Sequence, residues 1–239
     1  MMTLEEAVKK VRPLNEKAIE SAKKRWDSIA KPLHSLGELE NMLTQIAGIT
    51  GTPDVRVEKK AVVAMCADNG VVEEGVTQTG QEVTAIVAEN FLDGATTCCV
   101  MCRQCGAELF PVDVGMVVDT KVRTDLKVAY GTKNMTKEPA MTREQAVRAI
   151  EAGIAMAQEL KEKGYQVLAT GEMGIGNTTT SSAVAAVFLG RPVEDMTGRG
   201  AGLSGEGQVR TCRSSYLFRH KPCETDGFPF HPRCRTHPG

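Results

Sequence analysis

Short apolar runs alternate with longer amphipathic segments through most of the chain. The runs at 60–66, 109–114 and 166–170 are bounded by turn residues, a pattern typical of strands, and the run at 60–66 predicts a buried one. Apolar residues at helical spacing predict helices at residues 14–29, 36–47, 81–92, 96–105, 142–163 and 177–188. Strands that alternate with helices predict a parallel α/β sheet with helices on both faces, in which ligands bind beyond the carboxyl ends of the strands.

The ends of several predicted helices carry their own signals. Thr142 is followed three residues later by Gln145, the spacing of a capping box, and Gly164 closes that helix. Gly94 stands where the helix over 81–92 needs a C-cap. Near the N-terminus, the spacing predicts one apolar stripe along a helix, made of Leu36, Leu39, Leu43 and Ile46.

Composition narrows the function classes. The chain has 239 residues, 41% of them hydrophobic, and a net charge of -1, so a basic surface for nucleic acid is not indicated. No apolar run approaches the length of a membrane span, and the charged N-terminus lacks the apolar stretch of a signal peptide. We therefore expect a cytoplasmic protein whose eight cysteines stay reduced.

The composition changes near the C-terminus. Residues 1–210 carry 24 Lys and Arg against 28 Asp and Glu, whereas residues 211–239 carry 5 against 2. The last segment contains no Ala, Val, Ile or Met and shows no apolar periodicity. We expect a small helical domain over 1–50, an incomplete α/β nucleotide-binding core over 51–210 and a disordered tail over 211–239.

The turn over 171–180 is a candidate anion site. It reads GEMGIGNTTT and joins the end of a predicted strand to the start of a predicted helix. Backbone N–H groups and the helix dipole favour a phosphate at such a place, and glycines let the backbone approach it closely. The pattern matches neither GxxxxGK[ST] nor GxGxxG, so a tight turn without a ligand stays an alternative.

Two other loops could contribute to a site. The glycine-rich loop over 198–205 could face the first one and help to hold a sugar phosphate, or it could be only a flexible connection. The loop over 67–84 joins a strand end to a helix N-terminus, where functional residues often lie. Composition does not choose a general base among its acids, which are Asp68, Glu73, Glu74 and Glu82.

Cysteine-rich segments raise the alternative of a metal or redox protein. Residues 99–105 read CVMCRQC, as in iron–sulfur ligation, but the segment has helical character and lacks the Cys-Pro pair of a ferredoxin motif. The tail repeats HxxC without zinc-finger spacing, at His220/Cys223 and His231/Cys234. Buried cysteines without a metal are the preferred interpretation of the first segment.

Five segments occur together in a fixed order, which is far more specific than any single glycine loop. They are KPLHSLGELE (31–40), ADNGVVEEGVTQTGQEVTA (67–85), GAELFPVDVG (106–115), GEMGIGNTTTSSAV (171–184) and GRGAGLSGEG (198–207). Over about residues 3–210 the chain resembles the nicotinate-nucleotide–dimethylbenzimidazole phosphoribosyltransferase family.

This resemblance implies a fold and a reaction. The fold is a Rossmann-like α/β domain with a small helical domain, usually as a homodimer and without a cofactor. The reaction transfers a phosphoribosyl group from nicotinate mononucleotide to 5,6-dimethylbenzimidazole, and the products are α-ribazole 5'-phosphate and nicotinate. It belongs to the assembly of the cobalamin nucleotide loop.

The resemblance also implies roles for individual residues. The family's phosphate site corresponds to Gly174, Ile175, Gly176, Asn177 and Thr178, with Gly202 and Leu203 from the second glycine loop. Glu172 matches an acid of the nucleotide site, whose carboxylate would bind the ribose or support the cationic transition state. The region that lines the benzimidazole pocket corresponds to Thr79, Gly80 and Gln81, with Met173 nearby.

The chain departs from the family pattern after Arg210. The family's general-base glutamate, in a Gly-Glu-Gly-Thr-like segment, has no match, and the lysine near the phosphate corresponds to Thr211. A frame-shifted or truncated product would explain the tail, and we then expect poor stability and little or no activity. A non-catalytic nucleotide-binding fragment and a Cys/His metal-binding protein are the alternatives.

Overall fold

The structure is a computed structural model that describes residues 1–200, 209–211 and 214. The sheet in this part of the chain has three parallel strands in the order β2-β1-β3. The strands are β1 (Lys60–Ala67), β2 (Ala107–Gly115) and β3 (Val167–Met173). Three strands were predicted, and all three are found within a few residues of the expected bounds.

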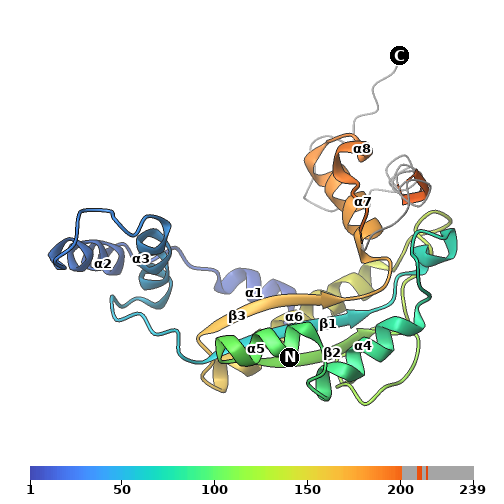
Figure 1. Ribbon diagram of the computed structural model, residues 1–239, viewed down its shortest axis with the longest axis horizontal. Coiled ribbons are helices and arrows are strands. Elements are labelled where there is room, and N and C mark those ends of the chain that lie inside the picture. The colour runs from blue at the N-terminus through green and yellow to red at the C-terminus, as the bar shows by residue number, and fades with distance from the viewer. Residues whose placement is uncertain (201–208, 212–213, 215–239) are drawn as a thin grey trace. The chain divides into compact units, whose positions relative to one another are not determined.

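The longer helices lie close to their predicted positions. They are α2 (Glu16–Ser28), α3 (Glu38–Thr50), α4 (Glu82–Leu92), α5 (Thr97–Cys105), α6 (Arg143–Glu162) and α7 (Asn177–Leu189). The predicted capping box opens α6, because Thr142 Oγ1 accepts the Gln145 N–H at 3.2 Å and Gln145 Oε1 accepts the Thr142 N–H at 2.9 Å. Figure 1 shows α5 on one side of the strands and α6 on the other, so the predicted α/β architecture is confirmed.

Three short helices have no counterpart in the prediction. They are α1 (Leu4–Lys10), the 3-10 helix η1 (Gly70–Glu74) and α8 (Val193–Met196). A capping box opens α1: Thr3 Oγ1 accepts the Glu6 N–H at 3.2 Å, and Glu6 Oε2 accepts the Thr3 N–H at 2.9 Å. With seven residues or fewer, each of these helices is too short to show an apolar period.

The end of β3 differs from the prediction. The sequence predicts a strand over 166–170 and a turn from Gly171, whereas β3 continues to Met173. A Cβ at Gly171 would lie 3.3 Å from the carbonyl oxygen of Val63 on β1. Gly171 therefore allows β3 and β1 to approach closely, and it does not form a turn. Glu172 lies on the strand.

The chain divides into two compact units. The first comprises residues 1–64, 97–110 and 147–171, and the second comprises residues 65–96, 111–146 and 172 onward. Because each strand starts in the first unit and ends in the second, the three carboxyl ends and the loops that follow them all belong to the second unit.

Helices α2 and α3 pack against each other within the first unit. A Cβ at Gly48 would lie 2.8 Å from Ile19 Cδ1, so a small residue is needed at this contact. The buried face of α3 consists of Glu40, Thr44, Ala47 and Gly48. The predicted apolar stripe is buried only in part: Leu43 and Ile46 are partly buried, whereas Leu39 is 49% exposed, and Leu36 precedes the helix and is 46% exposed.

A small apolar core holds the second unit together. Cys66 on β1, Ala88 on α4, and Met116 and Val122 after β2 are all buried and form one cluster. Burial raises the pKa of the Cys66 thiol to about 12, so it packs as a neutral hydrophobic group. A second cluster joins Val71, Val76, Met135 and Ala183, which places the first turns of α7 against the loop that follows β1.

One stretch of the described residues, Glu82–Cys105, is long and apolar enough to cross a membrane by length and composition. It contains two helices, because α4 ends at Leu92, α5 begins at Thr97, and Gly94 between them has a left-handed φ of 69°. A transmembrane helix needs about 20 consecutive residues, whereas α4 has 11 and α5 has 9. We therefore interpret the stretch as two helices of the α/β fold.

Candidate functional site

The phosphate loop, residues 174–178, joins β3 to α7. Gly176 has a φ of 90°, a left-handed conformation that L side chains rarely adopt. A Cβ at Gly174 would lie 2.6 Å from Glu172 Oε1 and 3.0 Å from Asn69 Nδ2. A Cβ at Gly174 would also meet the Ala67 carbonyl oxygen, so the backbone requires both of these glycines, which are two of the three glycines over 171–180.

The loop presents backbone N–H groups at the start of a helix. The Asn177 N–H donates to the Gly174 carbonyl, and the Thr179 N–H donates to the Gly176 carbonyl, both at 3.1 Å. Within the part of the chain that the structure describes, the N–H groups of Gly176 and Thr178 make no hydrogen bond. Two open donors at the positive end of the 13-residue helix α7 suit an anionic group such as a phosphate.

Glu172 lies beside this loop at the end of β3. Its side chain is open to solvent, and one carboxylate oxygen accepts a hydrogen bond from Asn177 Nδ2. Nearby protein atoms displace water and raise the pKa of Glu172, while the Asn177 hydrogen bond acts in the opposite direction. The site therefore combines N–H donors for a phosphate with a carboxylate that could hold ribose hydroxyls or stabilise a positive charge.

A cavity of about 460 Å³ opens along the start of α7. Its lining residues are Asn177, Thr178, Ser181, Ser182, Ala185, Met196, Gly198 and Gly200. Gly200 has a φ of 54°, and a Cβ there would lie 2.8 Å from Thr178 Oγ1. The beginning of the second glycine loop thus lines the same cavity as the phosphate loop. Gly202 and Leu203, which were also predicted to bind phosphate, lie outside the described residues.

Gln81, from the segment predicted to bind the benzimidazole, contacts Asn69, and Thr84 on α4 contacts the phosphate loop. Gln81 Nε2 donates to the Asn69 carbonyl at 3.0 Å, and Thr84 Oγ1 accepts the Ile175 N–H at 3.0 Å. Thr79 is exposed, and its carbonyl accepts the Thr77 hydroxyl at 2.7 Å.

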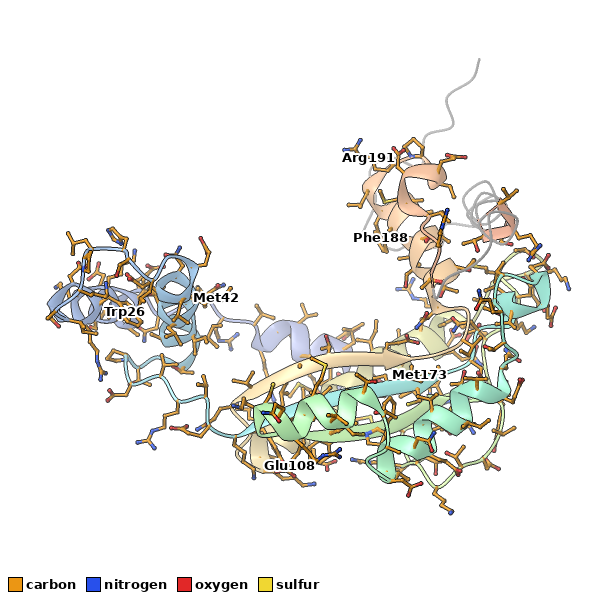
Figure 2. All side chains as sticks on the ribbon, in the orientation of Figure 1. Trp26, Met42, Glu108, Met173, Phe188 and Arg191 are labelled. Atoms are coloured by element: carbon orange, nitrogen blue, oxygen red, sulfur yellow. The ribbon has the colours of Figure 1, made fainter. Side chains whose placement is uncertain are left out.

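The other predicted residues of the benzimidazole pocket occupy different surroundings. Gly80 lies directly before α4, where its carbonyl accepts the Val83 N–H at 3.4 Å. Met173, labelled in Figure 2, packs against the cluster around Cys66 and Met116. Gln81 thus contacts Asn69, which in turn donates to the Ile175 carbonyl of the phosphate loop, whereas Met173 packs against the core at the strand end.

The four acids of the loop over 67–84 differ in their contacts. Asp68 is buried, and its Oδ2 accepts the Val117 N–H at 2.9 Å. Glu73 pairs with Lys137 at 2.8 Å, which lowers the pKa of Glu73. Glu74 accepts hydrogen bonds from the Asn134 amide and the Thr136 hydroxyl. These contacts give the three acids structural partners, and Glu82 remains exposed at the start of α4.

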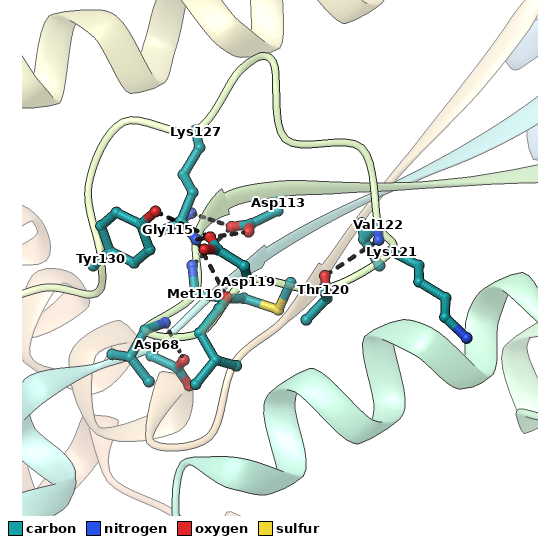
Figure 3. Close-up of polar contacts among 12 residues, drawn as sticks. Asp68, Asp113, Gly115, Met116, Asp119, Thr120, Lys121, Val122, Lys127 and Tyr130 are labelled. Carbon is teal, nitrogen blue, oxygen red and sulfur yellow. Dashed lines mark hydrogen bonds and ion pairs between the residues drawn. The ribbon is translucent and has the colours of Figure 1, made fainter.

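A buried ion pair that sequence reasoning missed fixes the end of β2 (Figure 3). Asp113 Oδ1 accepts the N–H groups of Gly115 and Met116 at 3.0 and 2.8 Å, and its Oδ2 lies 3.1 Å from Lys127 Nζ. Lys127 also pairs with Asp119 at 3.2 Å, and its Nζ lies 3.8 Å from the centroid of the Tyr130 ring. The Asp-x-Gly pattern at a strand end is the sequence signal that could have indicated this anchor.

The cysteines of α5 behave as small apolar residues. Cys99 and Cys102 are buried, Cys98 is partly buried and Cys105 is exposed. Burial raises the pKa of the Cys102 thiol. Among the described residues, no group of three or more His, Cys, Asp or Glu side chains could hold a metal ion. The His and Cys residues of the tail lie outside the described part of the chain.

Thr211, which matches the position of the family's lysine, is buried. The neighbouring Arg210 donates from Nε to the Gly75 carbonyl at 2.7 Å. This hydrogen bond holds the Arg210 side chain at Gly75, the residue that follows η1.

Residues 11–214 match the sequence model of a family described as a phosphoribosyltransferase. A nicotinate-nucleotide–dimethylbenzimidazole phosphoribosyltransferase from Ruminiclostridium cellulolyticum is 49% identical over 210 residues, which are 87% of this chain and 60% of that protein. A protein of the same name from Alkaliphilus metalliredigens is 41% identical over 234 residues, which cover 95% of this chain and 66% of that protein. An alignment that covers 95% of 239 residues must extend past residue 210, so the second one includes part of the tail.

The fold is also shared with a solved structure. The crystal structure of nicotinate-nucleotide–dimethylbenzimidazole phosphoribosyltransferase from Thermus thermophilus matches with a TM-score of 0.81 at 34% identity, over 90% of this chain and 64% of that one. The chain spans about 60% of the length of the first of these relatives. Sequence and fold agree across most of the described residues, and the chain belongs to the nicotinate-nucleotide–dimethylbenzimidazole phosphoribosyltransferase family.

Proposed function

We propose that this chain carries the phosphoribosyl-binding part of an enzyme that transfers phosphoribose from nicotinate mononucleotide to 5,6-dimethylbenzimidazole. The observation that supports this most directly is the phosphate loop, where the Gly176 and Thr178 N–H groups are open beside the Glu172 carboxylate. The same residues were assigned to the phosphate and the ribose from the family resemblance. Inorganic phosphate alone would need the N–H donors but not Glu172.

The chemistry of the reaction suits these groups. The ring nitrogen of nicotinate mononucleotide is a pyridinium, so the bond from C1' to nitrogen breaks with its electron pair moving to nitrogen, and nicotinate leaves without a protonating acid. A benzimidazole nitrogen forms the new bond to C1', and the proton on its other nitrogen passes to a base. No redox cofactor is required. The chain's residues would hold the phosphate at 174–178 and place Glu172 near the positive charge that develops on the ribose.

The partners follow from the same proposal. The nucleotide would bind at the cavity along α7, with Gly202 and Leu203 adding to the phosphate contacts. The benzimidazole would bind near Thr79, Gly80 and Gln81, close to the end of β3 at Met173. The general base would come from outside the residues described here. We further propose a cytoplasmic homodimer, without nucleic acid, membrane or metal partners.

A single assay tests the proposal. The protein is incubated with nicotinate mononucleotide and 5,6-dimethylbenzimidazole, and α-ribazole 5'-phosphate and free nicotinate are measured together by chromatography. Equal amounts of the two products support the transferase. Saturable mononucleotide binding without product would instead favour a non-catalytic nucleotide-binding fragment, and the absence of both would contradict the proposal. Elemental analysis of the same sample tests the metal-binding alternative.

A further inference from the structure

Asn69 lies directly beneath the phosphate loop, at the end of β1. Its Nδ2 donates to the Ile175 carbonyl at 3.2 Å, and its Oδ1 lies 3.1 Å from the Thr180 hydroxyl, whose proton it shares with the Asn177 carbonyl at 2.9 Å. A Cβ added at Gly174 or Gly176 would lie 3.0 Å from Asn69 Nδ2 or 3.3 Å from Asn69 Cβ, respectively. One side chain thus contacts the chain on both sides of Gly176, at Ile175 and at Thr180.

These contacts fix the orientation of the peptide groups on both sides of Ile175. The Ile175 N–H donates to Thr84 Oγ1, and its carbonyl is held by Asn69, so both of its polar groups point into the protein. A rotation of the peptide between Ile175 and Gly176 would move the Gly176 N–H together with that carbonyl, because the peptide unit is planar. The carboxamide of Asn69 therefore determines where the Gly176 N–H points.

The backbone at Asn69 contacts two other segments, the one around Gln81 and the loop that contains Thr132. Its carbonyl accepts Gln81 Nε2 at 3.0 Å, and the Thr132 hydroxyl accepts the N–H of the next residue, Gly70, at 3.1 Å. Asn69 is thus held from two directions while its side chain holds the phosphate loop. Gln81 belongs to the segment proposed to line the benzimidazole pocket.

We propose that Asn69 is a positioning residue for phosphoribosyl transfer, which keeps the N–H groups of the phosphate loop aimed at the phosphate and connects this loop to the segment around Gln81. The proposal rests on the proposed function for its ligand, a ribose 5'-phosphate group. It requires no contact between Asn69 and the substrate. Its structural part, the control of the loop by the carboxamide, holds without any ligand.

The first test needs no ligand. Amide hydrogen exchange is measured for residues 174–180 in the unliganded protein and in Asn69→Ala. Loss of both side-chain hydrogen bonds should speed exchange across this loop relative to the rest of the second unit. The matched control is Asn134→Ala, since Asn134 is also a carboxamide with side-chain partners and little exposure but contacts Glu74 instead of the loop. Exchange at 174–180 that stays unchanged in Asn69→Ala would overturn the proposal.

The second test measures affinity for nicotinate mononucleotide by calorimetry. Asn69→Ala should weaken mononucleotide binding about tenfold, because the loop loses stabilisation equal to the free energy of about one hydrogen bond. Asn134→Ala should bind the mononucleotide as the unaltered protein does. Asn69→Asp replaces the Nδ2 donor by a carboxylate oxygen that repels the Ile175 carbonyl. Its deficit should therefore exceed that of Asn69→Ala at neutral pH and shrink in acid, when a protonated carboxyl can donate again.

The comparison is made against the unaltered protein at each pH, because Glu172, whose pKa is raised by nearby protein atoms, and the phosphate also change protonation in acid. Equal losses of affinity in Asn69→Ala and Asn134→Ala would show a general folding effect and overturn the positioning role. If the unaltered protein binds no mononucleotide, the proposed function fails, and the exchange experiment still decides whether Asn69 controls the loop.

Discussion

The buried pair of Lys127 and Asp113 allows the strength of the strand-end anchor to be predicted from its surroundings. Asp113 is fully buried, the Lys127 side chain is 10% exposed, and the two charged groups are 3.1 Å apart. The substitution Lys127→Met keeps the length of the side chain and removes its charge. Asp113 Oδ2 would then have no partner among the described residues. Removing one member of such a pair leaves a buried charge uncompensated and costs about 3–5 kcal/mol of unfolding free energy.

The chain offers a matched control in Lys137→Met. Lys137 pairs with Glu73 at 2.8 Å, but the two side chains are 63% and 61% exposed. An exposed pair contributes about 0–1 kcal/mol, so the same chemical change should have little effect there. Urea unfolding of both variants measures the difference through the midpoint at constant slope. Equally small losses in the two variants would refute the reasoning, because burial would then have no influence on the cost.

The pH dependence of this pair has a definite sign. Burial disfavours the charged amine, but hydrogen bonds to Asp113 and Asp119 outweigh it and raise the pKa of Lys127 above 10.5. A raised lysine pKa stabilises the fold at every pH below the unfolded value, and this contribution is lost as the pH rises through the folded value. The stability difference between the unaltered protein and Lys127→Met should therefore stay constant from about pH 7 to 9 and shrink above about pH 10.4.

Three further substitutions, one of them with a control variant, test the phosphate loop, Glu172 and the start of α6. Gly174→Ala places a Cβ 2.6 Å from Glu172 Oε1, so mononucleotide affinity measured by calorimetry should fall at least about tenfold. The control is Gly153→Ala on α6, where nothing lies within 4 Å of the new Cβ and the unfolding free energy should rise by about 0.5–1 kcal/mol. Similar mononucleotide affinities for the two variants would contradict the role of the loop. Glu172→Gln should abolish the step in mononucleotide affinity that protonation of Glu172 causes. Nearby protein atoms displace water and raise the pKa of this carboxyl, so the step should lie above the usual range of glutamate; a step that persists in the variant would belong to another group. Thr142→Ala breaks the capping box of α6 and should cost about 1 kcal/mol in thermal or urea unfolding, and no loss would show that the box is dispensable.

The periodic parts of the fold were predictable because their signals are local. Helix α6 carries its apolar face, its capping box and its closing Gly164 within one continuous segment. The strands were recognisable as short apolar runs between polar turns. The end of β3 was not, because Gly171 is required by the Val63 carbonyl on a neighbouring strand, and nothing near Gly171 in the sequence indicates that contact.

The site was predictable in part for the same reason. The phosphate loop is a continuous segment with its own glycines, so its place between strand and helix follows from the sequence. Asn69 and Thr84 reach the loop from positions 106 and 91 residues earlier, and Lys127 reaches Asp113 across a long loop. Such contacts depend on how the strand ends are brought together, and composition gave no reason to select these side chains.

The central claim is that residues 174–178 bind the phosphate of a ribose 5'-phosphate. The most direct measurement follows the backbone amide resonances of Gly176 and Thr178 while the protein is titrated with nicotinate mononucleotide and, separately, with nicotinate. The mononucleotide should shift both amides saturably, and nicotinate, which has no phosphate, should leave them in place. Saturable mononucleotide binding that leaves both amides unmoved, or shifts produced equally by nicotinate, would contradict the claim.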